Sequence, residues 1–201
     1  YKSMHICPRC ETTLANFEVS QGYKDITDIS VTVKFELTDE PGTFVLAWTT
    51  TPWTLPGNVA LAVNPAITYM RIKNYELGIT EEQYILAKDR LSELGGTFEV
   101  VEEFLGRELV GKKYKPLFDY YANDEKLENR ENGWKIYAAY FVSTDEGTGV
   151  VHIAPAFGED DMRLEKEHKL PFIQHVSMDG TFKPEVTDFA SSSVKPKDDH
   201  Q

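Results

Sequence analysis

Hydrophobic and polar residues alternate along much of the chain, and a period of two predicts β-strands. The clearest case runs from 31 to 37, where Val, Val, Phe and Leu alternate with Thr, Lys and Glu. A Pro-Gly turn follows, and residues 43–49 form a β-rich run that we expect to be buried on both faces. Further strands are expected at 59–63, 68–73, 82–87, 97–104, 134–142 and 149–154.

Helical signals are few. Residues 88–94 predict a short helix closed by two glycines. Residues 159–168 predict a second one, with acids in its first turn and basic residues near its end, as the helix dipole favours. The segment 50–58 holds two prolines and a glycine, so we expect neither a regular strand nor a helix there. Many short strands with few helices predict an α+β fold that is β-rich and forms a closed or partly closed, barrel-like domain.

Polar and turn-rich stretches divide the chain. Residues 1–29 are expected to be an irregular lead-in, residues 30–190 the core of one domain, and residues 191–201 a disordered tail. Residues 122–133 lack periodicity and predict a long loop or a small insertion.

Composition then narrows the function classes. The chain has 201 residues, 21 basic and 33 acidic, and a formal net charge of −12. That balance argues against a protein that grips nucleic acid by neutralising phosphates. No stretch approaches the roughly 18 apolar residues needed to span a bilayer, so no membrane partner is expected.

The two cysteines, Cys7 and Cys10, lie three residues apart and cannot staple distant parts of a fold. They form half of a zinc site, with His5 a candidate third ligand, but no second pair exists in the chain. We expect no metal and no cofactor. The start without Met, signal core or transit stretch predicts a piece of a longer protein in a reducing compartment, the cytoplasm.

The first segment with chemical promise is the threonine run that ends the strand at 43–49. Thr49, Thr50 and Thr51 would place several hydroxyls around one small volume, and each hydroxyl donates and accepts. Trp53 follows in a proline-stiffened loop and predicts a pocket wall. The alternative is that threonine simply favours strands while proline and glycine end them.

The second segment runs from Gly147 to Asp161. His152 sits in an apolar strand, where a half-buried structural histidine is the ordinary alternative. The acids at 159–161 have an equally ordinary interpretation as helix caps. One of them facing a hydroxyl-lined pocket would attract the α-ammonium of an amino acid, a contact of about 1.5–3 kcal/mol.

Together these segments resemble the editing domain of isoleucyl-tRNA synthetases, which is inserted into the catalytic fold of class I synthetases. Valyl and leucyl relatives carry Thr-Thr-Arg-Pro where residues 50–53 read Thr-Thr-Pro-Trp, and they lack the His-Ile-Ala-Pro-Ala-Phe-Gly-Glu-Asp-Asp form of 152–161. The stretch 16–37 resembles the eukaryotic cytosolic version, and the likeness spans most of 1–190. The class I signatures His-Ile-Gly-His and Lys-Met-Ser-Lys-Ser are absent from the chain.

The resemblance implies hydrolysis of valine mischarged onto isoleucine tRNA, and of valyl-adenylate before transfer. One methylene in an apolar pocket discriminates by only about 1–3 kcal/mol, a magnitude known from isoleucyl-tRNA synthetases themselves, so a second pocket that admits valine alone multiplies selectivity. The implied partners are the terminal adenosine of the tRNA and the remainder of the synthetase, which would supply the phosphate grip that an acidic domain lacks.

The resemblance also implies roles for residues. The catalytic strip around the ester would be Thr49, Thr50 and Thr51. Trp53 and His152 would bound the side-chain pocket, and Asn58 would support or contact the site. Asp161 would hold the ammonium, with Asp160 as the competing assignment. We expect a positioned water to attack, assisted by the ribose hydroxyl, with no side chain required as general base. The alternatives are a non-catalytic module that binds aminoacyl-adenosine or the acceptor end, and a zinc-ribbon-like interaction domain.

Overall fold

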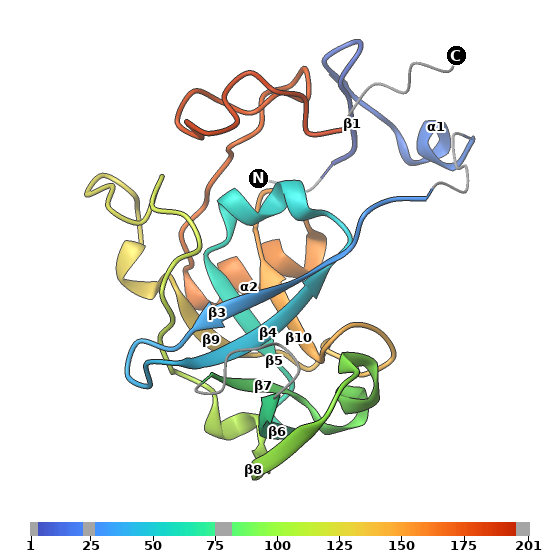
Figure 1. The fold of residues 1–201 in the computed structure, drawn as a ribbon. Coiled ribbons are helices and arrows are strands. Elements are labelled where there is room, and N and C mark those ends of the chain that lie inside the picture. The colour runs from blue at the N-terminus through green and yellow to red at the C-terminus, as the bar shows by residue number, and fades with distance from the viewer. Residues whose placement is uncertain (1–3, 22–26, 75–81, 196–201) are drawn as a thin grey trace.

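The strands form three sheets in the computed structural model, which describes residues 4–21, 27–74 and 82–195 (Figure 1). One sheet has the order β3-β4-β7-β6-β8, a second has the order β10-β5-β9, and β1-β2 is a short hairpin. The strands are β1 (Ile6–Cys7), β2 (Thr12–Thr13), β3 (Val31–Glu36), β4 (Thr43–Thr49), β5 (Ala60–Val63), β6 (Thr68–Asn74), β7 (Gln83–Ala87), β8 (Phe98–Leu105), β9 (Lys135–Ala138) and β10 (Val150–Ile153).

Helices are short and lie at the ends of strands. The α-helices are α1 (Asn16–Gln21) and α2 (Glu159–His168), and the 3₁₀ helices are Pro52–Gly57, Lys88–Leu94, Gly106–Glu108 and Arg130–Asn132. Among the described residues, none of these helices is long and apolar enough to cross a bilayer.

The alternation of the sequence places most of the elements. All eight predicted strands exist, although the one expected over 134–142 ends at Ala138. The helices predicted at 88–94 and 159–168 are confirmed, the first as a 3₁₀ helix. The prediction for 50–58 is wrong, because Pro52–Gly57 forms a 3₁₀ helix. Pro52 fits its first turn, where no amide donor is needed.

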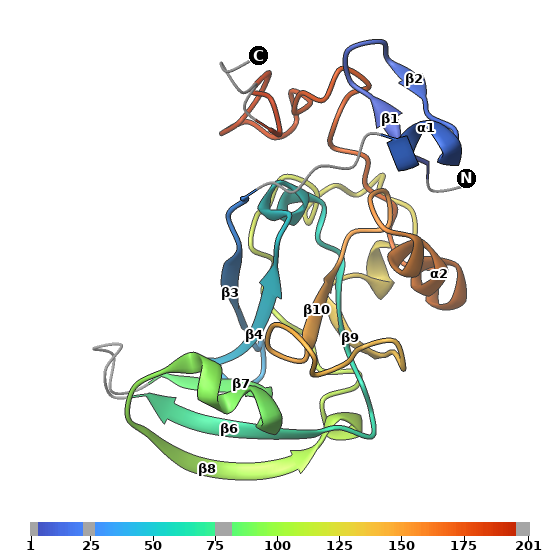
Figure 2. The same ribbon diagram turned by 90° about the vertical axis from the view of Figure 1, so that its right-hand side faces the viewer.

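The expected barrel is also wrong, since no closed barrel forms among the described residues. The prediction of a β-rich fold is confirmed, but the five-stranded and three-stranded sheets are separate. On one side isolated bridges connect them, from Leu37 to Tyr114 and from Lys113 to Lys135. Figure 2 shows β6, β7 and β8 lying across the foot of the upright strands β4 and β10. The alternation pattern predicts strands and faces but not which edges meet.

A shared core joins the two sheets. Its fully buried side chains come from both, among them Phe35, Val45, Leu61, Ile85 and Ile136. A second cluster packs α2 onto the three-stranded sheet through Leu164 and Ile153. This packing fixes the end of β4 beside β10, which is where the two chemically promising segments meet.

The N-terminal hairpin β1–β2 and the last part of the described chain both lie at the top of both views (Figures 1 and 2). Lys195 forms an ion pair with Asp28 at 2.9 Å. Val194 donates its backbone N–H to Gly180, so 191–195, expected to start a disordered tail, are hydrogen-bonded to the preceding turn. Residues 196–201 lie outside the described residues. The expected irregular lead-in, where described, contains β1, β2 and α1.

Candidate functional site

A cavity of ≈ 580 Å³ opens where β4 ends, β10 runs and α2 begins. Its lining brings together five of the seven predicted site residues, which are Thr49, Thr50, Thr51, His152 and Asp161. The two segments, about a hundred positions apart in the chain, therefore face one volume. Strands β4 and β10 belong to different sheets, so this meeting depends on the packing between the sheets.

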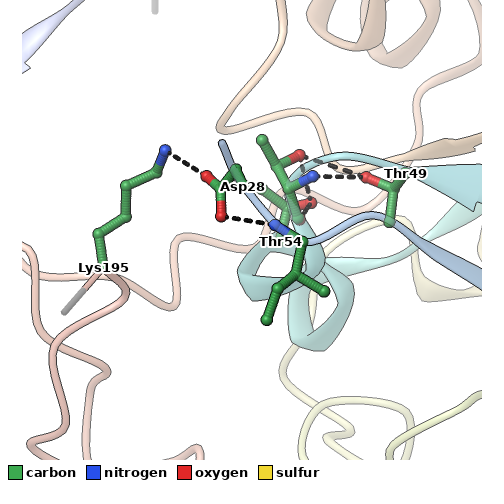
Figure 3. Close-up of polar contacts among 6 residues, drawn as sticks. Asp28, Thr49, Thr54 and Lys195 are labelled. Carbon is green, nitrogen blue, oxygen red and sulfur yellow. Dashed lines mark hydrogen bonds and ion pairs between the residues drawn. The ribbon is translucent and has the colours of Figure 1, made fainter. Parts of the chain in front are cut away.

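Hydroxyl groups of residues that line the cavity form a connected chain, and Figure 3 shows the contacts around Thr49 and Thr54. Thr49 Oγ1 accepts the backbone N–H of Thr51 at 3.1 Å and lies 3.3 Å from Thr51 Oγ1. Thr54 Oγ1 donates to the carbonyl oxygen of Thr51 at 2.7 Å. Thr50 is exposed and also lines the cavity. The strip is thus preorganised by its own backbone.

Thr54 is a cavity residue that our sequence analysis missed. Its side chain is buried and lines the cavity beside Thr51. The spacing of Thr51 and Thr54 could have indicated this, because residues three apart lie on the same face of a 3₁₀ helix. That inference requires Pro52–Gly57 to be predicted as a 3₁₀ helix.

His152 closes the buried side of the cavity, with 8% of its surface exposed. Its Nε2 lies 2.8 Å from Thr54 Oγ1. Because the single hydroxyl hydrogen of Thr54 goes to the Thr51 carbonyl, Nε2 carries the proton and donates. Burial lowers the pKa of His152 to about 4, helped by the nearby His175. The ring is therefore uncharged at neutral pH, so it affects the cavity through its size and position rather than through a charge.

Asp161 brings a carboxylate to the opposite side, at the start of α2. Its Oδ1 accepts the backbone N–H of Ala154 at 2.7 Å, which fixes the side chain against the end of β10. A methyl group on Gly158 would collide with this carboxylate, so the glycine allows the approach. Burial raises the pKa of Asp161 to about 6 despite the Ala154 bond. A carboxylate has about four acceptor positions, so Asp161 retains acceptor capacity for a cation.

Asp160, the competing candidate, points elsewhere. Its side chain is half exposed and forms an ion pair with Arg163 at 3.0 Å on the helix surface. The geometry thus favours Asp161 as the carboxylate that faces the cavity.

Trp53, which was expected to be a pocket wall, does not line the cavity. Its ring packs edge-on against Phe157 at 5.2 Å between centroids, and Phe157 is the ring that lines the cavity. The carbonyl oxygen of Trp53 accepts a hydrogen bond from Nε2 of the buried His175 at 2.9 Å. Trp53 therefore lies behind the wall rather than in it.

Asn58, which was expected to support or contact the site, does not line the cavity either. It is 5% exposed, donates from Nδ2 to the Ala60 carbonyl at 2.9 Å, and accepts from the Tyr114 hydroxyl at 2.7 Å. Both polar ends of its amide are thus used inside the protein. The placement supports a scaffolding role at the junction of the 3₁₀ helix and β5.

The cysteine pair lies in the β1–β2 turn, away from the cavity. Cys7 and Cys10 are free thiols, and the Cys7 carbonyl accepts the backbone N–H of Glu11 at 2.8 Å. Within the described ranges no group of three or more His, Cys, Asp or Glu side chains is placed to hold a metal ion.

Curated relatives match almost the whole chain. It is 44% identical to an isoleucine–tRNA ligase of Clostridium acetobutylicum over 198 residues, which is 98% of this chain and 18% of the relative. It is 44% identical to that of Chlamydia trachomatis serovar D over 190 residues, 93% of this chain and 18% of the relative. The chain thus spans about a fifth of the length of these relatives. Both are bacterial, and the eukaryotic likeness of 16–37 stays a prediction.

Solved structures show a similar fold. The crystal structure of GlLeuRS-CP1 covers 69% of this chain and 58% of that chain, with a TM-score of 0.55 and 17% identity. The editing domain of cytosolic leucyl-tRNA synthetase from P. knowlesi covers 70% and 62%, with a TM-score of 0.53 and 16% identity. No family model matches the chain.

Proposed function

We infer that this chain, homologous over 98% of its length to one segment of the isoleucine–tRNA ligases, is an editing hydrolase that releases valine from mischarged isoleucine tRNA. The observation that carries the proposal is that one cavity is lined by both the threonine strip and Asp161. An aminoacyl ester needs both: hydroxyls near the ester and ribose, and an anion for the α-ammonium.

The chemistry is ester hydrolysis. Water adds to the ester carbonyl, the bond from that carbon to the ribose oxygen breaks, and the ribose oxygen takes the proton, so the products are valine and tRNA with a free hydroxyl. Thr49, Thr50 and Thr51 donate to and accept from the ester, the ribose and the attacking water. Asp161 binds the ammonium, which fixes the carbonyl relative to that strip. Its charge serves binding, so no side chain is assigned as general base.

His152 supports a size limit on the amino-acid side chain. The ring is held by the Thr54 bond, stays neutral, and belongs to β10, which pairs with β5, so its displacement would break these contacts. We propose that it admits valine and excludes the extra methylene of isoleucine.

The same site would accept valyl-adenylate, which carries the same ammonium, acyl carbon and ribose. The remainder of the synthetase would hold the tRNA body, since the chain carries a net charge of −12. The free thiols of Cys7 and Cys10 support a reducing compartment, and we propose the cytoplasm.

The test uses the intact polypeptide that contains this chain. Valine release from valyl-tRNA is measured for the wild type, for Asp161→Ala and for the half-exposed control Asp160→Ala. The proposal expects release by the wild type and by Asp160→Ala, and loss in Asp161→Ala. Undiminished release by Asp161→Ala would overturn the assignment.

A non-catalytic binding module is the second candidate, because the threonines and Asp161 that line the cavity would also suffice to bind an aminoacyl-adenosine without cleaving it. It predicts that the wild type binds a valyl-adenosine analogue without releasing valine from valyl-tRNA. Binding and release measured on one preparation separate the two functions.

A further inference from the structure

The wall at one end of the cavity is a single stretch of backbone. Residues Glu146, Gly147 and Thr148 line the substrate cavity and also a second cavity of ≈ 430 Å³, and both cavities are also lined by Trp48. Within this wall Thr148 is buried, whereas Glu146 is exposed and Gly147 has no side chain. The position of the wall therefore depends on the contacts that hold its backbone.

Arg90 provides that hold from the 3₁₀ helix Lys88–Leu94, which lies beside the loop in Figure 1. Its Nε donates to the carbonyl oxygen of Gly147 at 2.8 Å, and its Nη1 donates to that of Asp145 at 3.3 Å. Its Nη2 lies 3.6 Å from the Glu93 carboxylate, and the side chain is 18% exposed. The planar guanidinium holds two carbonyls in one fixed geometry, which a lysine ammonium cannot reproduce.

Gly147 makes the loop dependent on this clamp. It has φ of +66°, and a Cβ there would lie 2.9 Å from Cε3 of Trp48. The backbone therefore rests directly on the indole and has no side chain of its own to anchor it. Thr148 anchors the next position, donating from Oγ1 to the Leu46 carbonyl at 2.6 Å.

The register of β10 shows which part of a substrate meets this wall. Asp161 binds Ala154, just past the end of β10, whereas Gly147–Gly149 precedes its start at Val150. Val150 and Ala154 are four residues apart, roughly 13 Å along a strand. With the ammonium at Asp161 and the ester at the threonine strip, the base of the nucleoside extends toward the loop. This step rests on the proposed function.

We propose that Arg90 is a positioning residue that sets the nucleoside end of the cavity through the carbonyls of Asp145 and Gly147. It touches no substrate atom. Its loss displaces the wall that the adenine meets, while the amino-acid end, fixed by Asp161 and His152, stays in place.

The test compares two probes on the intact polypeptide. One is 2′-valylamino-2′-deoxyadenosine, in which an amide replaces the ester, and the other is the same valylamino sugar without adenine. Arg90→Lys and Arg90→Ala are compared with Glu93→Gln, which keeps the guanidinium, and with Arg107→Lys, an exposed arginine. Gly147→Ala moves the same wall from the Trp48 side without touching Arg90.

We expect Arg90→Lys, Arg90→Ala and Gly147→Ala to weaken the adenosine probe about tenfold. The base-free probe should change less than twofold, and KM for valyl-tRNA should rise with kcat nearly constant. Both controls should match the wild type. Equal loss for the two probes, or unchanged binding of the adenosine probe, would overturn the role of Arg90. Absence of valine release by the wild type would contradict the proposed function, and the probe comparison would still decide the role of Arg90.

Discussion

The segment from Thr51 to Asn58 has two faces, and they differ in what their polar groups do. On the cavity face, Thr51 and Thr54 form a hydroxyl chain that reaches His152. On the inner face, the side-chain amide of Asn58 hydrogen-bonds to the Ala60 carbonyl and the Tyr114 hydroxyl. Both faces are polar and half-buried or buried, yet only one meets the cavity. The comparison shows that residues close in sequence can have different roles. Their position in the 3₁₀ turn decides whether a side chain lines the cavity or stabilises the fold.

The division has an energetic meaning. Polar groups on the inner face are fully satisfied by protein, so their removal costs stability. Polar groups on the cavity face lie where a ligand would bind, so their removal costs binding or rate. Single substitutions can therefore disrupt one face at a time.

Asp161→Asn should give the largest effect. The substitution keeps the shape and the acceptor for Ala154 but removes the charge, so the ammonium contact of about 1.5–3 kcal/mol is lost. We expect kcat/KM for valine release to fall about 10- to 100-fold, with thermal stability equal to or above that of the wild type. Asp160→Asn, on the exposed side of the same turn, should leave both unchanged. A normal rate in Asp161→Asn would show that the ammonium binds elsewhere.

Acid should mimic that substitution. The pKa of Asp161 is raised to about 6, so the free site loses its charge as pH falls through 6. We expect kcat/KM to fall about tenfold per pH unit below that point. The check is a pH–rate profile with circular dichroism at each pH. A profile that is flat between pH 7 and 5 while the protein stays folded contradicts the carboxylate role.

The buried histidines predict a separate pH effect on stability. Burial lowers the pKa of His152 and His175 to about 4, against 6.5 for an ordinary histidine. Between pH 6.5 and 4 the unfolded chain therefore binds more protons than the folded one, and their contribution to stability falls as pH falls through that window. Asp161 acts in the opposite direction, because the folded state binds its proton more readily. Urea unfolding of Asp161→Asn between pH 7 and 5 removes the opposing Asp161 contribution, and a stability that rises toward pH 5 would contradict the histidine effect.

Asn58→Ala breaks the inner face. It leaves the Tyr114 hydroxyl and the Ala60 carbonyl without their partner, and each unsatisfied buried group costs about 1–3 kcal/mol. We expect the free energy of unfolding to fall by about 2–6 kcal/mol for the two groups together, while KM for valyl-tRNA stays near the wild-type value at low temperature. Asn123→Ala, at an exposed turn, is the matched control. A rise in KM without a loss of stability would instead indicate that Asn58 takes part in substrate binding.

Thr50→Val should have the smallest effect on stability. Thr50 is exposed and lines the cavity, so we expect a change within about 0.5 kcal/mol together with a reduced rate of valine release. Urea unfolding and the release assay on the same preparation provide the measurement. Loss of stability with an unchanged rate would place Thr50 in the scaffold.

Sequence patterns predicted most of the strands and helices, but only part of how these elements pack together. Alternation placed β3 and β4, and the charge pattern placed α2, because both depend on neighbours in the chain. The barrel failed because sheet closure depends on which edges pair. Trp53 was expected to line the cavity because it is close to Thr51 in sequence. Closeness in sequence does not fix the direction of a side chain, and in the 3₁₀ turn the indole packs against Phe157 instead. Thr54 was missed because recognising it required the same turn.

The central claim is that the cavity binds an aminoacyl-adenosine with its ammonium at Asp161. A structure of the intact polypeptide with 2′-valylamino-2′-deoxyadenosine tests it most directly. We predict the valyl ammonium within hydrogen-bond distance of the Asp161 carboxylate, the amide that replaces the ester beside Thr49–Thr51, and the adenine at Gly147. An analogue bound outside the cavity, or with its ammonium away from Asp161, would contradict the account.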